Sequence, residues 1–170
     1  MNIIFLGMPM SGKTTIGRMV AEKLKFQFYD TDELMDHEKN LSIGKIIENY
    51  GEKYFRDQEK KLIEDYLHID SHVISTGGGA VNIITKEIIK KYTHRVWLRC
   101  PIKRLIERYE PNKKNRPLLY NTTNIKEKLK TSLSARMPFY AECANIIINS
   151  DSDSPQDLAD TVILNINEKN

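Results

Sequence analysis

Short apolar runs alternate with longer amphipathic segments along the chain. Five runs have the length and the β-branched or aromatic content of strands, at 3–6, 26–29, 72–75, 95–98 and 145–148. The segments between and after them have the periodicity of helices, at 14–24, 41–50, 52–67, 85–92, 102–109, 125–140 and 155–166. Strands that alternate with helices form parallel sheets covered on both faces, so the pattern predicts a three-layer α/β fold. Ligands of such folds bind at the carboxyl ends of the strands.

Length and composition are those of one globular domain, expected over residues 1–170. The formal net charge of +3 is too small to indicate a nucleic-acid partner. The first apolar run is short and leads into a glycine-rich loop, and no run is long enough to span a bilayer, so we expect neither a signal peptide nor a membrane partner. Cys100 and Cys143 lie far apart without metal-ligand spacing, which is typical of reduced, buried thiols in a cytoplasmic protein.

A phosphate-binding motif follows the first predicted strand. Residues 7–14 read GMPMSGKT and fit the P-loop pattern G-x-x-x-x-G-K-[ST] between a strand and a helix, which is the context that this motif requires. In such a loop backbone N–H groups face phosphate oxygens, Lys13 places its charge on the β- and γ-phosphates, and Thr14 offers its hydroxyl to Mg²⁺. A glycine-rich turn without a ligand is the simpler alternative. The flanking strand and helix favour a nucleoside triphosphate site.

Acidic residues follow the second predicted strand, and glycines follow the third. Many P-loop proteins carry a Mg²⁺-binding aspartate after the third strand, but this chain has Gly77, Gly78 and Gly79 there. Asp30, at the neighbouring strand end, is therefore the expected carboxylate for the metal. Asp32 is then available to accept the proton of a substrate hydroxyl or to orient it. Its alternative role is to cap a helix that begins near residue 33. The glycines are expected to let the backbone approach a ligand closely.

Two arginines lie toward the apolar sides of predicted helices. In the helix at 125–140 apolar residues recur every four positions, and Arg136 falls on the same side, just before Pro138. In the helix at 52–67, Arg56 is three residues before Glu59, which lies on the apolar side. An inward guanidinium requires an anionic partner, and its planar fork matches a carboxylate. The pattern favours a carboxylate clamp formed by Arg56 and Arg136; the alternative for each is a solvated helical residue.

The polar, basic segment at about 111–124 is long enough to be a functional loop. Arg116 lies within it, and an arginine beside a P-loop is a candidate lid residue that stabilises charge on the transferred group. The alternative is an exposed loop cation. No histidine or serine has the spacing of a nucleophile or of a metal site, so hydrolase chemistry is not expected.

Together these residues resemble the shikimate kinase family over nearly the whole chain. The motifs that carry the resemblance are GMPMSGKTT at 7–15, DTD at 30–32, GEKYFRDQE at 51–59, STGGGAV at 75–81, NRPLL at 115–119 and ARMPFY at 135–140. The resemblance implies a P-loop NTPase fold of the nucleoside-monophosphate-kinase type, with three α/β/α layers around a five-stranded parallel sheet. It also implies transfer of the γ-phosphoryl group of ATP to the 3-hydroxyl of shikimate, a step toward chorismate and the aromatic amino acids.

The resemblance further implies roles for particular residues. The nucleotide-binding set is Met10, Ser11, Gly12, Lys13, Thr14, Thr15, Arg108 and Arg116, with Arg108 the candidate to pack on adenine. The shikimate-binding set is Asp32, Arg56, Gly77, Gly78, Gly79 and Arg136, with a substrate-binding segment at about 32–61 from which Ile43 and Phe55 pack against the ring. The catalytic set is Asp32, Lys13 and Arg116. Mg²⁺ is expected on Thr14 and, through water, on Asp30.

The chain departs from the family pattern at three places. Met10 stands where family P-loops commonly have glycine, so the outer turn of the loop is expected to differ. The approach to the lid, at 108–116, is one residue longer than expected. Residues 149–153 read NSDSD where members often have an arginine against adenine, which predicts weaker nucleotide affinity or base selectivity.

Two other functions stay open from the sequence. A kinase of the gluconate kinase type would share the P-loop and a hydroxy-acid substrate, whereas the combination of Arg56, Arg136 and the two motifs DTD and GGG favours shikimate. A nucleotide-binding module without an acceptor would need neither Asp32 nor an inward Arg136. The expected partners are ATP and shikimate alone, without nucleic acid or membrane, for a monomer in the cytoplasm.

Overall fold

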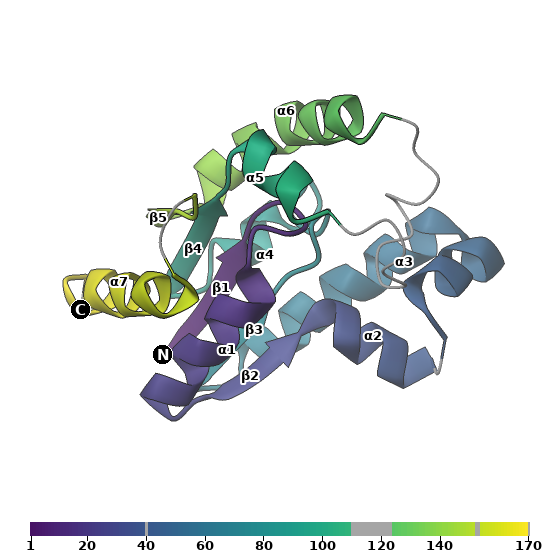
Figure 1. Ribbon diagram of the computed structural model, residues 1–170. Helices are drawn as coiled ribbons and strands as arrows, with labels where there is room; N and C mark the ends of the chain where they lie inside the picture. The colour runs from purple at the N-terminus through teal and green to yellow at the C-terminus, as the bar shows by residue number, and fades with distance from the viewer. Residues whose placement is uncertain (40, 110–123, 152–153, 170) are drawn as a thin grey trace.

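The computed structural model describes residues 1–39, 41–109, 124–151 and 154–169 (Figure 1). The strands are β1 (Asn2–Leu6), β2 (Gln27–Asp30), β3 (His72–Ser75), β4 (His94–Arg99) and β5 (Ile146–Asn149). The helices are α1 (Lys13–Leu24), α2 (Thr31–Lys39), α3 (Ile43–Leu67), α4 (Lys86–Ile89), α5 (Ile102–Glu107), α6 (Ile125–Cys143) and α7 (Pro155–Asn167). Their order follows the predicted alternation.

The strands form one parallel sheet in the order β2-β3-β1-β4-β5. The central strand β1 pairs with β3 on one side, where Ile4 lies opposite Ile74, and with β4 on the other, where Phe5 lies opposite Val96. Every residue of β1 is buried. The predicted five-stranded parallel sheet is confirmed. The chain connections reverse direction at β1, and such a switch point places a binding crevice at the carboxyl ends of the strands.

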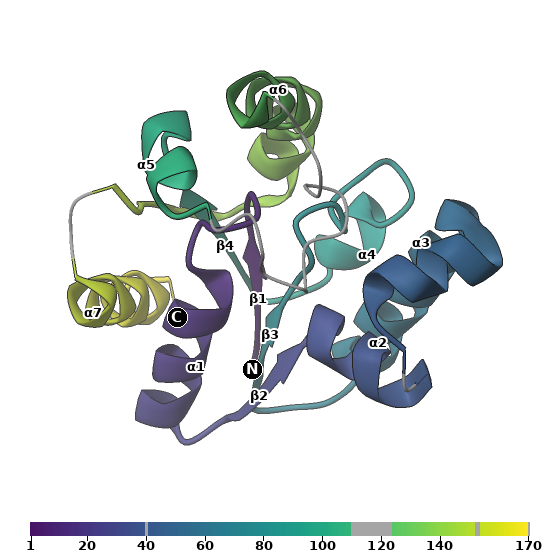
Figure 2. The same ribbon diagram turned by 45° about the vertical axis from the view of Figure 1, so that its right-hand side comes forward.

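Helices cover both faces of the sheet. Ile3 and Phe5 of β1 pack with apolar residues of α1 and α7, whereas Ile4 and Leu6 pack with residues of α3, α4, α5 and α6. This alternation is the two-residue period of a strand that is buried on both faces. Figure 2 shows α1 and α7 on one side of the strands and α3 and α4 on the other. The three-layer prediction is therefore confirmed.

A projection formed by α2 and the first half of α3 has a small core of its own. Met35, Ile43, Ile46 and Phe55 form a hydrophobic cluster separate from the two on the sheet. Within α3 the helical backbone is broken at Gly51, where φ is 85° and ψ is 160°. Glycine adopts this conformation readily because it has no Cβ. The break lies where the sequence predicts a boundary between two helices.

Several boundaries differ from those predicted. β5 begins at Ile146, one residue later than predicted. The side chain of Asn145, just before it, accepts a hydrogen bond from the Arg95 N–H (2.7 Å) and donates one to the Thr93 carbonyl oxygen (2.9 Å). α4 is only four residues long. α6 continues through Pro138 to Cys143. No helix in the described part of the chain is both long and apolar enough to cross a membrane.

Candidate active site

A cleft of about 930 Å³ lies at the carboxyl ends of β1, β2 and β3. It brings together the P-loop, the DTD motif, residues from both halves of α3, the glycine run Gly77–Gly79 and one face of α6. The sequence-predicted residues that line it are Met10, Gly12, Lys13, Thr14, Thr15, Asp30, Asp32, Arg56, Gly77, Gly78, Gly79, Arg108 and Arg136, together with Ile43 and Phe55. Segments far apart in the sequence therefore meet at one site.

The P-loop needs left-handed backbone at three positions. The φ angles are 144° at Gly7, 67° at Met10 and 99° at Gly12. Such angles are free of cost for glycine, whereas a residue with a side chain is strained by about 1 kcal/mol or more. Met10 therefore takes the conformation that suits the glycine common in the family. A Cβ at Gly7 would also lie only 2.7 Å from the Leu98 carbonyl oxygen, because the loop passes directly over β4.

Lys13 is held against its own loop. Its Nζ donates hydrogen bonds to the carbonyl oxygens of Gly7 (3.0 Å) and Met8 (2.9 Å), and the residue is only 6% exposed. Lys13 is also the first residue of α1, whose first turn contains no acidic side chain. The positive end of the helix dipole and the ammonium group thus act at the same place, which is a favourable site for phosphate.

Asp30 connects the P-loop to α2. Its Oδ2 accepts a hydrogen bond from Thr14 Oγ1 (2.7 Å), and its Oδ1 accepts one from the Asp32 N–H (2.9 Å). Because α2 begins at Thr31, Asp30 occupies the position of a helix N-cap. The alternative in which Asp32 caps a helix from about residue 33 is therefore wrong. The capping carboxylate is Asp30, and Asp32 lines the cleft.

Asp32 has the electrostatic environment of a base. Burial, reinforced by the negative charges of Asp30 and Glu59, raises its pKa from 3.8 to about 7, although the charge of Lys13 acts in the opposite direction. A carboxylate with a pKa near the working pH is a stronger base than an ordinary aspartate and is still partly ionised. Asp32 can therefore both accept a proton and release it near neutral pH.

Arg56 is fixed by two carboxylates of its own helix. It donates from Nη1 to Glu59 Oε2 at 2.5 Å and from Nη2 to Glu52 Oε1 at 3.3 Å, and its side chain is only 15% exposed. Glu59 is 1% exposed, and burial raises its pKa despite the neighbouring Arg56 charge. Glu59 Oε1 has no hydrogen-bond partner among the described residues. The alternative of a solvated Arg56 is therefore wrong.

Each residue of the glycine run is in close contact with a different part of the site. A Cβ at Gly77 would lie 2.6 Å from Asp32 Oδ1 and one at Gly79 would lie 2.7 Å from Arg56 Nη2. At Gly78 it would lie 2.4 Å from Cδ of Pro9. These close contacts are within the protein, and the predicted close approach to a ligand stays a prediction. The glycines allow Asp32, the P-loop and Arg56 to pack against one backbone segment.

α6 contributes Arg136 to the same cleft. Arg136 Nη1 and the Tyr140 hydroxyl each lie 4.0 Å from Met8 Sδ. The Tyr140 hydroxyl also donates to the Gly78 carbonyl oxygen at 2.8 Å, and burial raises the pKa of Tyr140 to about 12. Tyr140 therefore remains a neutral donor that ties α6 to the glycine run. No sequence pattern distinguishes Met8 or Tyr140, because only the fold brings them together.

The P-loop end of the cleft contains Arg108. Its Nη1 donates to the Met10 carbonyl oxygen (3.2 Å), and its Nη2 donates to the Ser150 carbonyl oxygen (3.4 Å). Pro155 and Leu158 of α7 also line the cleft. Neither residue was predicted to line the cleft, because in the sequence Pro155 indicates only the start of a helix. The position of Pro155 after the last strand is the signal that could have indicated this side of the cleft.

Of the predicted nucleotide-site residues that the structure describes, Ser11 does not line the cleft. Ser11 is fully buried, and its N–H donates to the Met8 carbonyl oxygen at 3.2 Å, so it supports the loop from within. Arg116 and residues 111–123 of the predicted lid lie outside the described residues. Cys100 and Cys143 are buried with free thiols, as predicted.

Comparison with known proteins gives consistent relatives. The sequence model of the shikimate kinase family matches residues 9–167. A shikimate kinase of Sulfurihydrogenibium is 35% identical over 169 residues, which cover 99% of each chain. One from Caldicellulosiruptor bescii is 37% identical over 163 residues, or 95% of this chain and 93% of the relative.

Solved structures show the same likeness. The shikimate kinase of Acinetobacter baumannii in complex with shikimate superposes with a TM-score of 0.93 at 33% identity, covering 98% of this chain and 93% of that one. The shikimate kinase of Aquifex aeolicus superposes with a TM-score of 0.84 at 30% identity, covering 98% and 96%.

Proposed function

The chain belongs to the shikimate kinase family, and on that premise we propose what each part of its cleft contributes to the reaction. The reaction is the transfer of the γ-phosphoryl group of ATP to the 3-hydroxyl of shikimate. Phosphoryl transfer requires little covalent chemistry from a protein, which acts by positioning the reactants and by neutralising charge. Different side chains of the cleft therefore hold the two substrates.

The P-loop end binds ATP. Lys13 exchanges the Gly7 and Met8 carbonyl contacts, at 3.0 and 2.9 Å, for β- and γ-phosphate oxygens, while backbone N–H groups of residues 10–15 hold the phosphates. Arg108, with Pro155 and Leu158, forms the side of the cleft against which adenine packs. Arg116 closes over the γ-phosphate from the lid at about 111–124.

Thr14 and Asp30 form the metal end of the site. Hydroxyl and carboxylate oxygens are ligands that Mg²⁺ accepts, and the two groups already meet at 2.7 Å. Mg²⁺ usually keeps several waters and is completed by substrate phosphates, so two protein oxygens are enough for this role. Thr14 would hold Mg²⁺ directly and Asp30 would hold it through water, and the ion would supply positive charge against the phosphates of ATP.

Asp32 orients the shikimate hydroxyl and takes its proton. Its raised pKa of about 7 keeps it basic enough to assist the attack of the hydroxyl oxygen on the γ-phosphorus. Lys13 lies close enough to lower that pKa, so both groups act near the transferred phosphoryl. Loss of the proton to Asp32 coincides with the growth of negative charge that Lys13 and Arg116 stabilise.

The charges opposite Asp32 select a carboxylate. Arg56 and Arg136 bring two guanidinium groups to this end of the cleft. The buried Glu59 carboxylate interacts with both, and Glu52, which is 62% exposed, pairs with Arg56 at 3.3 Å. The carboxylate of shikimate adds a partner for the guanidinium N–H groups that face the cleft. The backbone of Gly77, Gly78 and Gly79 and the side chains of Ile43 and Phe55 bound the remaining space. The cluster of Asp32, Arg56, Glu59 and Arg136 in one cleft is the observation that carries this proposal.

The test is ADP release from Mg·ATP with shikimate, gluconate, AMP or no acceptor. We expect stimulation by shikimate alone, from a monomer that works in the cytoplasm. Stimulation by gluconate would keep phosphoryl transfer and contradict the carboxylate clamp as described. Turnover that ignores every acceptor would favour a nucleotide-binding module instead. Sedimentation of the same sample tests the monomer.

A further inference from the structure

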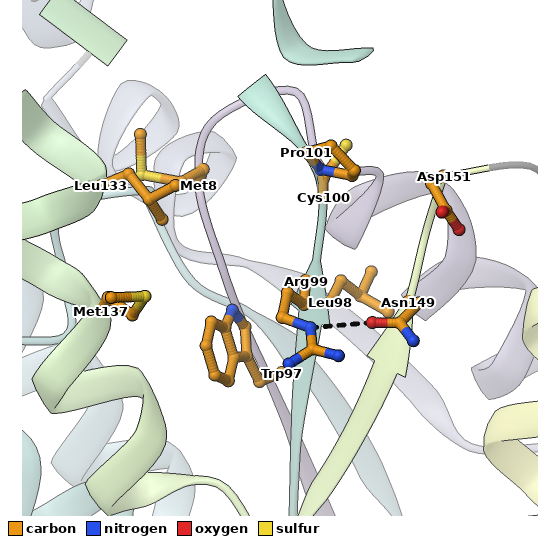
Figure 3. A pocket seen from close by; sticks show the side chains of 10 residues that line it. All are labelled: Met8, Trp97, Leu98, Arg99, Cys100, Pro101, Leu133, Met137, Asn149 and Asp151. Carbon is orange, nitrogen blue, oxygen red and sulfur yellow. Dashed lines mark hydrogen bonds between the residues drawn. The ribbon is translucent and has the colours of Figure 1, made fainter. Parts of the chain in front are cut away.

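A second cavity, of about 240 Å³, lies between α6 and the carboxyl ends of β4 and β5 (Figure 3). Of the residues that line the active-site cleft, only Met8 also lines this cavity. None of the roles proposed above uses it. A cavity of about 150 Å³ already accepts benzene, so this one has room for a single ring with a small substituent and no room for a nucleotide.

The walls of the cavity suit a flat apolar group. Figure 3 shows Met8, Leu133 and Met137 on one side and Trp97 with Arg99 on the other. An indole and two thioethers are groups on which an aromatic ring packs well. Met137 is 48% exposed although it lies on the helix that covers this part of the sheet, so its side chain is available to a ligand.

Arg99 gives the cavity a specific polar end. Its Nε donates to Asn149 Oδ1 at 2.8 Å, and the described residues provide its guanidinium with no ion pair or other hydrogen bond. This hydrogen bond holds one edge of the guanidinium of the exposed Arg99, while its two terminal amino groups have no partner among the described residues. A planar guanidinium with two free N–H donors matches a carboxylate. Asp151 also lines the cavity, and in Figure 3 it lies away from Trp97 and Arg99.

We propose that this cavity binds a small aromatic monocarboxylate, with its ring between Trp97 and the side chains of Met8 and Met137 and its carboxylate on Arg99. The apolar walls supply the affinity for the ring, and Arg99 supplies the preference for an anion over a neutral analogue. The carboxylate of Asp151 opposes the ligand's charge and limits its affinity.

An occupant of this cavity acts on both ends of the active site through Met8. The Met8 carbonyl oxygen accepts the hydrogen bond from Lys13 Nζ at 2.9 Å. Its Sδ lies 4.0 Å from Arg136 Nη1 and 4.0 Å from the Tyr140 hydroxyl. A ring that packs on the Met8 side chain therefore contacts a residue that in turn contacts both Lys13 and Arg136. Occupancy changes the KM for ATP or for shikimate.

Trp97 is the only tryptophan of the chain and serves as the probe. The full chain is titrated with benzoate while indole fluorescence is recorded, with shikimate and ADP saturating so that Arg56 and Arg136 are occupied. We expect the fluorescence to change saturably as benzoate is added. Benzamide should bind about tenfold more weakly than benzoate, and benzoate should bind about tenfold more weakly to Arg99→Gln, because in each case a charge-assisted hydrogen bond is lost. Asp151→Asn tightens benzoate binding by about threefold, because a like charge is removed.

Lys103→Gln is the matched control, since it makes the same charge change at an exposed position of α5 that does not line the cavity. It leaves benzoate affinity within about twofold, and all three variants keep the basal kinase activity. An Arg99→Gln protein that binds benzoate as tightly as the parent would overturn the site. Competitive displacement of benzoate by shikimate would also overturn the site, since benzoate would then occupy the clamp formed by Arg56 and Arg136. Saturating benzoate that leaves both KM values unchanged would overturn the coupling through Met8.

Discussion

The two ends of the cleft are constructed differently. At the P-loop end, one continuous stretch of eight residues, Gly7–Thr14, forms the site largely with its backbone. Carbonyl oxygens of the same loop hold the Lys13 side chain. At the acceptor end, Asp32, Arg56 and Arg136 come from three separate helices, and side-chain charges hold them in place. The first end is a local backbone structure, and the second exists only when the whole domain is folded.

This difference predicts where substitutions are selective. Removing a side chain at the acceptor end deletes one charge from a coupled group and should affect shikimate or catalysis while ATP binding survives. A side chain added at Gly77 or Gly78, where the two ends of the cleft touch, should displace the group that it contacts. The substrate held by that group should then bind more weakly.

The largest effect is expected for Asp32→Ala. The variant loses the base and should lower kcat by about 10³-fold, while ATP affinity, which rests on the P-loop, stays within about threefold. Single-turnover assays measure the first value, and equilibrium binding of ATP measures the second. An equal loss of both would show that Asp32 supports the P-loop rather than proton transfer.

Arg136→Ala should act mainly on the acceptor. It removes one of the two guanidinium groups from the clamp, so the KM for shikimate should rise by about 10- to 100-fold, with the KM for ATP little changed. Steady-state kinetics with each substrate varied measures both. Lys130→Ala, on the exposed side of the same helix, is the control and should leave both values unaltered. An unchanged KM for shikimate in Arg136→Ala would refute the clamp.

The pH dependence should distinguish the two ends as well. Because the pKa of Asp32 is raised to about 7, the basic form is lost as the pH falls below that value. We expect kcat/KM for shikimate to fall about tenfold per pH unit below about 7 and to level off above it. ATP binding should show no such step. A profile of Asp32→Ala that keeps the same step would assign it to another group.

The smallest effects, and the sharpest contrast, are expected from two glycine substitutions. Gly78→Ala meets the rigid Pro9 ring at 2.4 Å and should raise the KM for ATP several-fold. Gly77→Ala meets the carboxylates of Asp32 and Glu59 at 2.6 and 2.8 Å and should raise the KM for shikimate instead. Each should lower stability by about 1–3 kcal/mol, which thermal unfolding would detect. If both variants raised the same KM values, the two ends of the cleft would not be affected independently.

The sequence was sufficient for the features encoded locally. The P-loop, the strands and the break at Gly51 follow from short patterns, because glycine placement and apolar runs act on adjacent residues. Arg136 could be placed in the cleft because helical periodicity indicates which face is buried.

Features that depend on distant contacts could not be predicted in the same way. Asp30 rather than Asp32 caps α2, because the helix begins at Thr31, two residues earlier than the pattern suggested. The effect of Glu59 on Asp32, and the position of Met8 between Lys13 and Arg136, arise only when β1, α3 and α6 pack together. No pattern within any one of these segments contains that information.

The separate core of the projection has a consequence for local stability. Met35, Ile43, Ile46 and Phe55 pack with one another apart from the sheet, and a Cβ at Gly51 would meet no atom within 4 Å. Such a unit can unfold alone at a lower free energy than the sheet requires. Backbone amides of 31–50 should therefore exchange with deuterium earlier than those of β1. If shikimate binds between Phe55, Arg56 and Gly77–Gly79 as proposed, it should slow that exchange. Substrate affinity then includes the free energy of closing this unit, so substitutions in its core would weaken shikimate binding without touching the ligand.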